Sequence, residues 1–136
     1  MDISQNGIDL IKQFEGCSLS AYKCSRGIWT IGWGHTAGVK QGDRITQEKA
    51  DELLKNDLKI YEAHVASIVK IPLKQNEFDA LVSFCYNCGQ ANLKMLVKNR
   101  NTAQIADAIL LYNKSGSKTL AGLVKRRTAE RNLFLQ

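Results

Sequence analysis

The segment that most constrains how this chain can fold is residues 14–36, FEGCSLSAYKCSRGIWTIGWGHT. Glu15 stands directly before Gly16, a residue that commonly ends a helix because it takes left-handed backbone angles without strain. A polar stretch follows, and then large and small residues alternate from Trp29 to His35. This period of two is typical of a strand that packs on one side. The segment therefore predicts a helix end, a turn and a strand, with a carboxylate at the first junction.

The predicted strand has two faces of very different size. Trp29, Ile31 and Trp33 would share one face. Thr30 would lie on the other face with two glycines, which leaves backbone and a hydroxyl open to a flat ligand. A lone carboxylate at a helix end beside such a strand is a candidate general acid, and Glu15 is that candidate.

Helical patterns fill most of the remaining chain. Residues 4–15 carry apolar side chains at helical spacing, with Ser4 as a candidate N-cap. Thr46 is the candidate N-cap of a long helix that runs to about Val69, and Pro72 ends that pattern. Shorter helices are predicted over 74–88 and 92–97, from 101 or 102 onwards, and from about 119 towards the C-terminus.

These patterns predict an α+β fold in one domain, residues 1–136, because a chain of this length suits a single main core. A small antiparallel sheet lobe would cover about 16–45. A larger helical lobe would cover about 70–136 together with the N-terminal helix. The long helix would connect the two lobes, and a cleft is expected between them.

The segment 14–36 resembles the active-site segment of the phage-type lysozymes, or endolysins, of glycoside hydrolase family 24. That family has a Glu after an aromatic residue, an Asp nine positions later, a Thr six positions after that, and a glycine–aromatic–glycine–His–Thr ending. The matching residues here are Glu15, Cys24 and Thr30, and the ending is complete at 32–36. The second half is similar as well, in an aromatic-Asn-x-Gly pattern that ends at residue 89 and in a G-L-x-x-R-R-x-x-E pattern over 122–130.

The resemblance implies a lysozyme-like fold and hydrolysis of the β-1,4 bond between N-acetylmuramic acid and N-acetylglucosamine in bacterial peptidoglycan, with lysis of the host cell. Glu15 would give its proton to the departing sugar, while the family's Asp and Thr hold the attacking water. Cys24 replaces that Asp. A thiolate there could orient water, stabilise positive charge at the anomeric carbon or attack that carbon. Alternatively, Cys24 is a tolerated thiol and Thr30 alone positions the water.

Four residues of the second half are candidates for binding substrate. Tyr86, Asn87 and Tyr112 are predicted to hold the sugar, because saccharides bind through flat apolar faces together with amide hydrogen bonds. Tyr112 stands where the family usually has a Trp before its glycine loop. Arg126 is the fourth candidate, although it or Arg127 could instead contact the catalytic acid.

Charge is unevenly distributed along the chain. Residues 1–68 hold 8 Lys and Arg against 9 Asp and Glu, or −1, and residues 69–136 hold 11 against 4, or +7, which sums to the net +6. A basic half suits nucleic acid, anionic lipid or an acidic cell wall, although a solvated cationic surface explains many of the lysines. No basic-aromatic motif accompanies the charge, so we expect peptidoglycan and not nucleic acid as the partner. No cofactor is implied, and we expect a monomer.

No apolar run approaches the roughly 20 residues that span a bilayer, so stable membrane insertion is not expected. The first residues also lack the basic and apolar regions of a secretory signal. We therefore expect synthesis in the host bacterial cytoplasm and release to the periplasm and cell wall at lysis. The resemblance implies that a holin provides the route.

The cysteines raise two further alternatives. Cys85 and Cys88 form a C-x-x-C motif, which could indicate redox or zinc chemistry. Cys17 and Cys24, however, have six residues between them, which is not the usual zinc spacing, and we predict no metal site. The alternatives to a lysozyme are therefore a thiol or zinc protein and, because of Cys24, a non-catalytic peptidoglycan-binding module with a degenerate active site.

Overall fold

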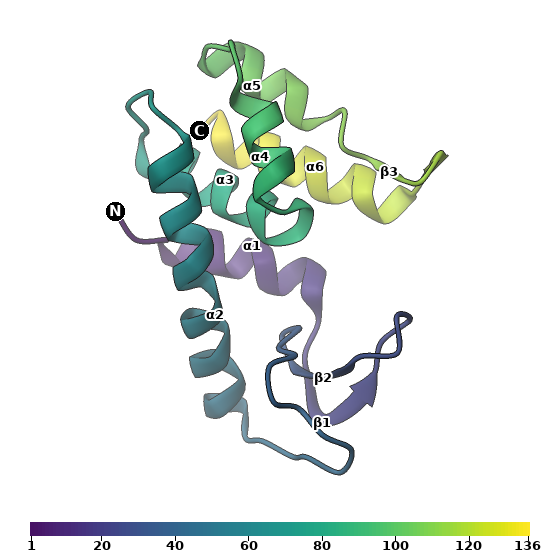
Figure 1. The fold of residues 1–136 in the computed structure, drawn as a ribbon. Coiled ribbons are helices and arrows are strands. Elements are labelled where there is room, and N and C mark those ends of the chain that lie inside the picture. Colours follow the sequence, from purple (N-terminus) through teal and green to yellow (C-terminus); the bar gives the residue numbers. More distant parts are fainter. The chain divides into compact units, whose positions relative to one another are not determined.

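The computed structural model describes all residues, 1–136, and the chain divides into two compact units (Figure 1). The sheet unit consists of Ile11–Lys59, and the helical unit consists of Met1–Leu10 and Ile60–Gln136. Two helices contribute residues to both units: α1 (Gln5–Glu15) and α2 (Gln47–Ile68). The mixed α+β class predicted from the sequence is confirmed.

The sheet unit is built around an antiparallel pair of strands, β1 (Ser18–Lys23) and β2 (Trp29–Gly32). Tyr22 lies opposite Thr30, and a bulge interrupts the register nearer the start of β1. A third backbone segment follows β1, because Ala21 donates its N–H to the Asp43 carbonyl and Ile45 donates to the Leu19 carbonyl, each at 2.9 Å. β1 is therefore bonded to β2 on one edge and to residues 43–45 on the other, and the β1–β2 turn extends from this small sheet.

The prediction of one open-faced strand over residues 29–35 is wrong. β2 ends at Gly32, where the backbone takes a positive φ of 65°, and Ile31 and His35 then exchange two backbone hydrogen bonds of 2.9 Å. The chain has turned back on itself, so the alternation cannot continue along one strand. Thr30 is 5% exposed and Ile31 is 2% exposed, which leaves no open face on β2.

The helical unit is organised around α3 (Gln75–Cys88). Every residue from 78 to 85 is buried, which is the pattern of a helix covered on all sides. α3 packs against α6 (Ala121–Phe134) and α4 (Gln90–Val97), and α5 (Thr102–Ile109) packs against both of these helices (Figure 1). The predicted loop between α5 and α6 contains a tight hairpin of two short strands, β3 (Lys114–Ser115) and β4 (Lys118–Thr119).

The two predicted N-caps have different outcomes. Thr46 caps α2 as predicted, since its hydroxyl accepts the Lys49 N–H at 3.1 Å. Ser4 does not cap α1 with its side chain. Its hydroxyl donates to Asp79 on α3, and its backbone N–H donates to the same carboxylate at 2.9 Å. Ser4 therefore ties the start of the chain to the buried centre of the helical unit. Separately, none of the helices combines the length and apolarity needed to cross a bilayer.

Candidate active site

Glu15 is the last residue of α1, as the sequence predicted, and its side chain is half-buried. Gly16 follows with a φ of +67°, and its N–H donates back to the Lys12 carbonyl at 3.3 Å. A Cβ added at Gly16 would meet nothing within 4 Å, so the requirement for glycine comes from the backbone conformation and not from space. This turn fixes where the carboxylate lies relative to the strand that begins two residues later.

Cys24 and Thr30 are brought together by the β1–β2 hairpin. Cys24 follows the last residue of β1 and begins a tight turn in which the Gly27 N–H donates to the Cys24 carbonyl at 2.9 Å. The Cys24 N–H donates to the Ile28 carbonyl at 3.0 Å, and the Thr30 hydroxyl donates to the same carbonyl at 3.0 Å. One backbone oxygen therefore holds both predicted catalytic residues in place.

The hairpin also changes the acidity of the Cys24 thiol. The pKa of Cys24 lies below its ordinary value. The backbone N–H of Arg26 has the largest lowering effect, and the backbone N–H of Ile28 has the next largest. The Thr30 hydroxyl and the Arg26 charge lower this pKa further, while partial burial opposes the change. The hydroxyl has one proton, so it donates either to the Ile28 carbonyl or to the thiolate at any moment. The arrangement favours a thiolate with a hydroxyl beside it.

Polar contacts connect the residues after β2 to α2 within the sheet unit. The Trp33 indole donates to Asp51 at 2.8 Å, and Lys12 forms an ion pair with the same carboxylate at 3.2 Å. The Trp33 hydrogen bond, followed by Lys12, holds the pKa of Asp51 below its usual value. His35 lies 2.8 Å from Asp57, and this contact is made inside the sheet unit.

The helical unit holds the four predicted substrate-binding residues. Tyr86 is half-buried, with its ring edge against Tyr61 at 5.1 Å between centroids. Tyr112 is also half-buried and packs edge-on against Phe84 at 4.9 Å. Asn87 is exposed, and its side-chain oxygen accepts a hydrogen bond from Arg127. These three residues keep partly accessible polar or aromatic surfaces.

Arg126 is buried, unlike the other three predicted substrate-binding residues. It is 3% exposed, and its Nε lies 3.2 Å from Glu130 Oε2, so the two side chains form a buried ion pair. Sequence reasoning missed that Arg126, Arg127 and Glu130 form one buried cluster with Ser83. The hydroxyl of Ser83 donates to Glu130 at 2.5 Å, and Arg127 lies 2.9 Å from the other carboxylate oxygen. Spacings of three and four between Arg and Glu on one helix were the available signal.

Burial dominates the electrostatics of this cluster. Glu130 is fully buried, and loss of water around it raises its pKa, against the opposing effect of the two guanidinium groups. The Arg127 guanidinium also lies 5.2 Å from the centroid of the Phe84 ring, and the Phe84 ring packs edge-on against Tyr112. Arg127 on α6 and Tyr112 after α5 therefore both contact the Phe84 ring of α3.

The remaining cysteines give little support to a thiol or zinc protein. All four cysteines are free, and two lie in each unit. Burial raises the pKa of Cys85 to about 11, and burial likewise raises that of Cys88, whose sulfur accepts from Arg127 at 3.0 Å. No group of three or more His, Cys, Asp or Glu side chains is arranged to hold a metal ion. The C-x-x-C motif is thus the end of a buried helix and carries thiols of low reactivity.

A family model described as phage lysozyme matches residues 12–130, a span that includes the complete Glu15, Cys24 and Thr30 arrangement. The chain belongs to the phage lysozyme family. The predicted lysozyme-like fold, family and glycoside hydrolase class are therefore confirmed.

Individual relatives agree with this family over most of the chain. The endolysin of Salmonella phage P22 is 45% identical, and the match covers 99% of each chain. The endolysin of Lactococcus phage c2 is 47% identical over 98% of this chain, but the match spans only 60% of that relative. Among solved structures, the muramidase domain of SpmX from Asticaccaulis excentricus is 38% identical with a TM-score of 0.92, covering 99% of this chain and 98% of the other.

Proposed function

We propose that this phage lysozyme hydrolyses the β-1,4 bond between N-acetylmuramic acid and N-acetylglucosamine in bacterial peptidoglycan, with Glu15, Cys24 and Thr30 as its catalytic residues. The observation that carries the proposal is the hairpin that fixes Cys24 and Thr30 on the Ile28 carbonyl, one strand away from the helix end that holds Glu15. A binding module without activity would have no need for a thiol of lowered pKa at this position.

Glycosidic cleavage requires a proton on the departing oxygen and a nucleophile at the anomeric carbon. In the proposed reaction, Glu15 gives its proton to the oxygen of the departing sugar as that bond breaks. The Cys24 thiolate and the Thr30 hydroxyl hold a water molecule, whose oxygen bonds to the anomeric carbon. The released proton passes to the thiolate and then through solvent to the Glu15 carboxylate, which restores the starting state.

The N–H groups that lower the pKa of Cys24 also make its thiolate a weaker base. Its negative charge therefore contributes mainly by orienting water and by stabilising positive charge as the sugar departs. Thr30 is almost fully buried and its hydroxyl is anchored, so it can hold water in one direction only.

For the sugar itself we propose Tyr86, Asn87 and Tyr112 as binding residues, because each keeps part of its polar or aromatic surface accessible. Arg126 is assigned a supporting role, since its guanidinium is buried against Glu130. Loss of the Arg126 side chain should therefore lower the free energy of unfolding more than it changes the Michaelis constant.

Turbidity loss of permeabilised Gram-negative cells tests the catalytic assignment. Glu15→Gln should lower the clearing rate by about 1,000-fold, because general acid catalysis contributes in that range. Cys24→Asp should retain activity, whereas Cys24→Ala should lose about 100-fold or more. Cys17→Ala, which removes an exposed thiol, is the matched control and should clear at the unchanged rate.

Two results would contradict the proposal. Equal clearing by the Glu15→Gln and unchanged proteins would contradict the role of Glu15, and absence of clearing by both, with wall binding retained, would support the peptidoglycan-binding alternative. Unchanged activity in Cys24→Ala would remove the thiol from the reaction and leave Thr30 as the residue that positions water.

We also propose that the protein works as a monomer on the cell wall after leaving the host cytoplasm, through the opening that a holin makes. The +7 charge of residues 69–136 supports attraction to an anionic wall. Sedimentation velocity would contradict the monomer by showing a dimer at working concentration, and lysis by the chain without a co-expressed holin would contradict the route.

A further inference from the structure

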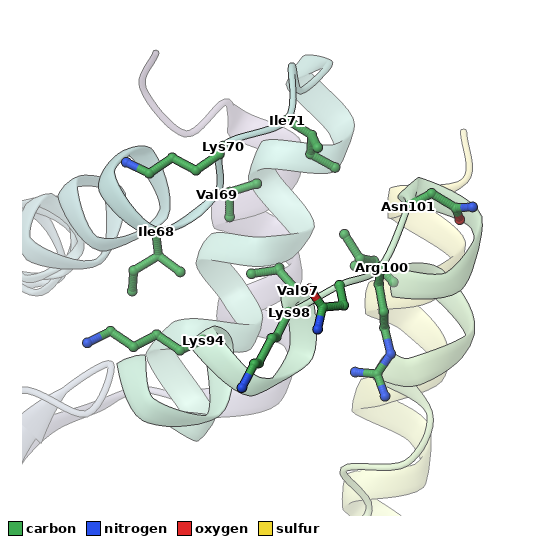
Figure 2. A pocket seen from close by; sticks show the side chains of 11 residues that line it. Ile68, Val69, Lys70, Ile71, Lys94, Val97, Lys98, Arg100 and Asn101 are labelled. Atoms are coloured by element: carbon green, nitrogen blue, oxygen red, sulfur yellow. The ribbon is translucent and has the colours of Figure 1, made fainter.

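A hollow of about 580 Å³ lies in the helical unit, and none of the residues assigned to catalysis lines it (Figure 2). It is bounded by the end of α2, the turn after it, the last turn of α4 and the beginning of α5. Its floor is aliphatic and consists of Ile68, Val69, Ile71, Val97 and Ile105. An aliphatic floor without aromatic rings is suited to flexible hydrocarbon and gives a sugar or a base no flat surface for stacking.

The edge of the same hollow is cationic. Lys70, Lys94, Lys98 and Arg100 line it, and no acidic residue does. Figure 2 shows Lys70 and Lys94 extending on the same side, with Ile68 between them. Cations around an aliphatic surface are complementary to a molecule that carries a negative group at one end and hydrocarbon at the other.

The backbone holds these cations in a defined arrangement. α4 ends before Lys98 and α5 is capped by Asn101, so only Asn99 and Arg100 connect the two caps. Asn99 takes a positive φ of 56°, the only non-glycine residue to do so, which makes this connection a tight turn. Arg100 Nη1 donates to the Leu96 carbonyl at 2.9 Å, so its guanidinium stays at the edge of the hollow.

An apolar side chain lies next to the cations. Met95 is 63% exposed, and it lines a neighbouring depression together with Lys98, Asn99 and Arg100. An exposed apolar side chain beside two cations, Lys98 and Arg100, suits a surface that contacts the boundary between lipid headgroups and acyl chains.

We propose that this groove binds the headgroup of an anionic phospholipid, with the upper carbons of an acyl chain over the aliphatic floor, and so attaches the helical unit to a membrane surface. The proposal does not depend on the catalytic assignment. The phosphate would contact Lys94, Lys98 and Arg100, and Met95 would enter the interface. Nucleic acid fits less well, because the groove has cations but no ring on which a base could stack.

Co-sedimentation with vesicles tests the proposal on the full chain. The protein should bind vesicles of equimolar phosphatidylglycerol and phosphatidylcholine, and it should not bind phosphatidylcholine alone. The double variant K94Q/K98Q should lower the partition coefficient by about 30-fold, since each cation near an anionic surface contributes roughly fivefold. Met95→Ser should lower it by about fivefold through lost apolar contact.

The matched control is K114Q/K118Q, which removes the same charge from the exposed β3–β4 hairpin of the same unit. It should lower binding by less than about threefold. Circular dichroism confirms that each variant is folded, and hydrolysis of purified peptidoglycan by K94Q/K98Q should stay unchanged. That second readout separates failure of this proposal from failure of the catalytic one.

Equal loss of vesicle binding in the two double variants would overturn the proposal, because the attraction would then come from diffuse charge. An unchanged partition coefficient in K94Q/K98Q would overturn it as well. So would a single-stranded oligonucleotide that binds more tightly than the vesicles and depends on the same two lysines, since the groove would then be a nucleic-acid site.

Discussion

The two units use polar side chains in opposite ways. In the sheet unit, Cys24 and Glu15 are only partly buried, and backbone turns set their positions. In the helical unit, Glu130 and Arg127 are fully buried, and side chains bond to side chains. In this protein the fully buried charges have a structural role, whereas the two ionisable groups assigned to the reaction, Glu15 and Cys24, keep part of their surface accessible.

The largest test of this comparison is Glu130→Ala. Removing the carboxylate leaves two buried guanidinium groups without their counter-charge, which should lower the free energy of unfolding by about 3–5 kcal/mol. Asp107→Ala on α5 is the control, because it removes the exposed carboxylate that pairs with Arg131 on α6. It should lower the free energy of unfolding by less than about 1 kcal/mol. Urea denaturation measures the free energy of unfolding of both variants, and similar decreases in the two would contradict the structural role of the buried cluster.

A smaller effect is expected at the helix end that carries Glu15. Gly16→Ala puts a side chain at a positive φ and should lower the free energy of unfolding by about 1–2 kcal/mol, although the space is open. Gly122→Ala is the opposite case, since it lies inside α6 with open space around it and should raise stability by about 0.5–1 kcal/mol. Thermal or urea unfolding of the pair should show changes of opposite sign.

The reactivity of single thiols gives the smallest and most specific effect. Cys24 should react with iodoacetamide at neutral pH about fivefold faster than Cys17, because the Arg26 and Ile28 N–H groups lower its pKa. Cys85, with a pKa of about 11, should be nearly unreactive. Variants that keep one cysteine at a time make the measurement direct.

The pH dependence has a definite sign. A lowered pKa means that the thiolate persists below the pH at which an ordinary cysteine is protonated, and the fast reaction of Cys24 should disappear only as the pH falls through that lowered value. Equal rates for Cys17 and Cys24 across the range would show that the hairpin does not activate the thiol.

Much of the fold was predictable, because its signals are local. Thr46 caps α2, and Gly16 ends α1 directly after Glu15, as expected from a hydroxyl and a glycine at those places. The three catalytic candidates also followed from spacing and family resemblance, although their roles stay a proposal.

The predictions that were wrong, or that were missing, have two causes. One is contact between residues distant in sequence, and the other is a turn inside an alternating sequence pattern. Ser4 bonds to Asp79, which is far away in sequence, so no local rule could direct its hydroxyl. Gly32 reverses the chain where alternation predicted a continuous strand. The burial of Arg126 against Glu130 and Ser83 was not predicted, because it depends on residues of two different helices.

One consequence concerns how such an enzyme can change during evolution. The Ile28 oxygen that anchors Cys24 and Thr30 belongs to the main chain, so replacing the Ile28 side chain cannot delete it. Position 24 can therefore exchange one anionic group for another while the anchor survives, and a lineage is free to test new chemistry there without rebuilding the loop.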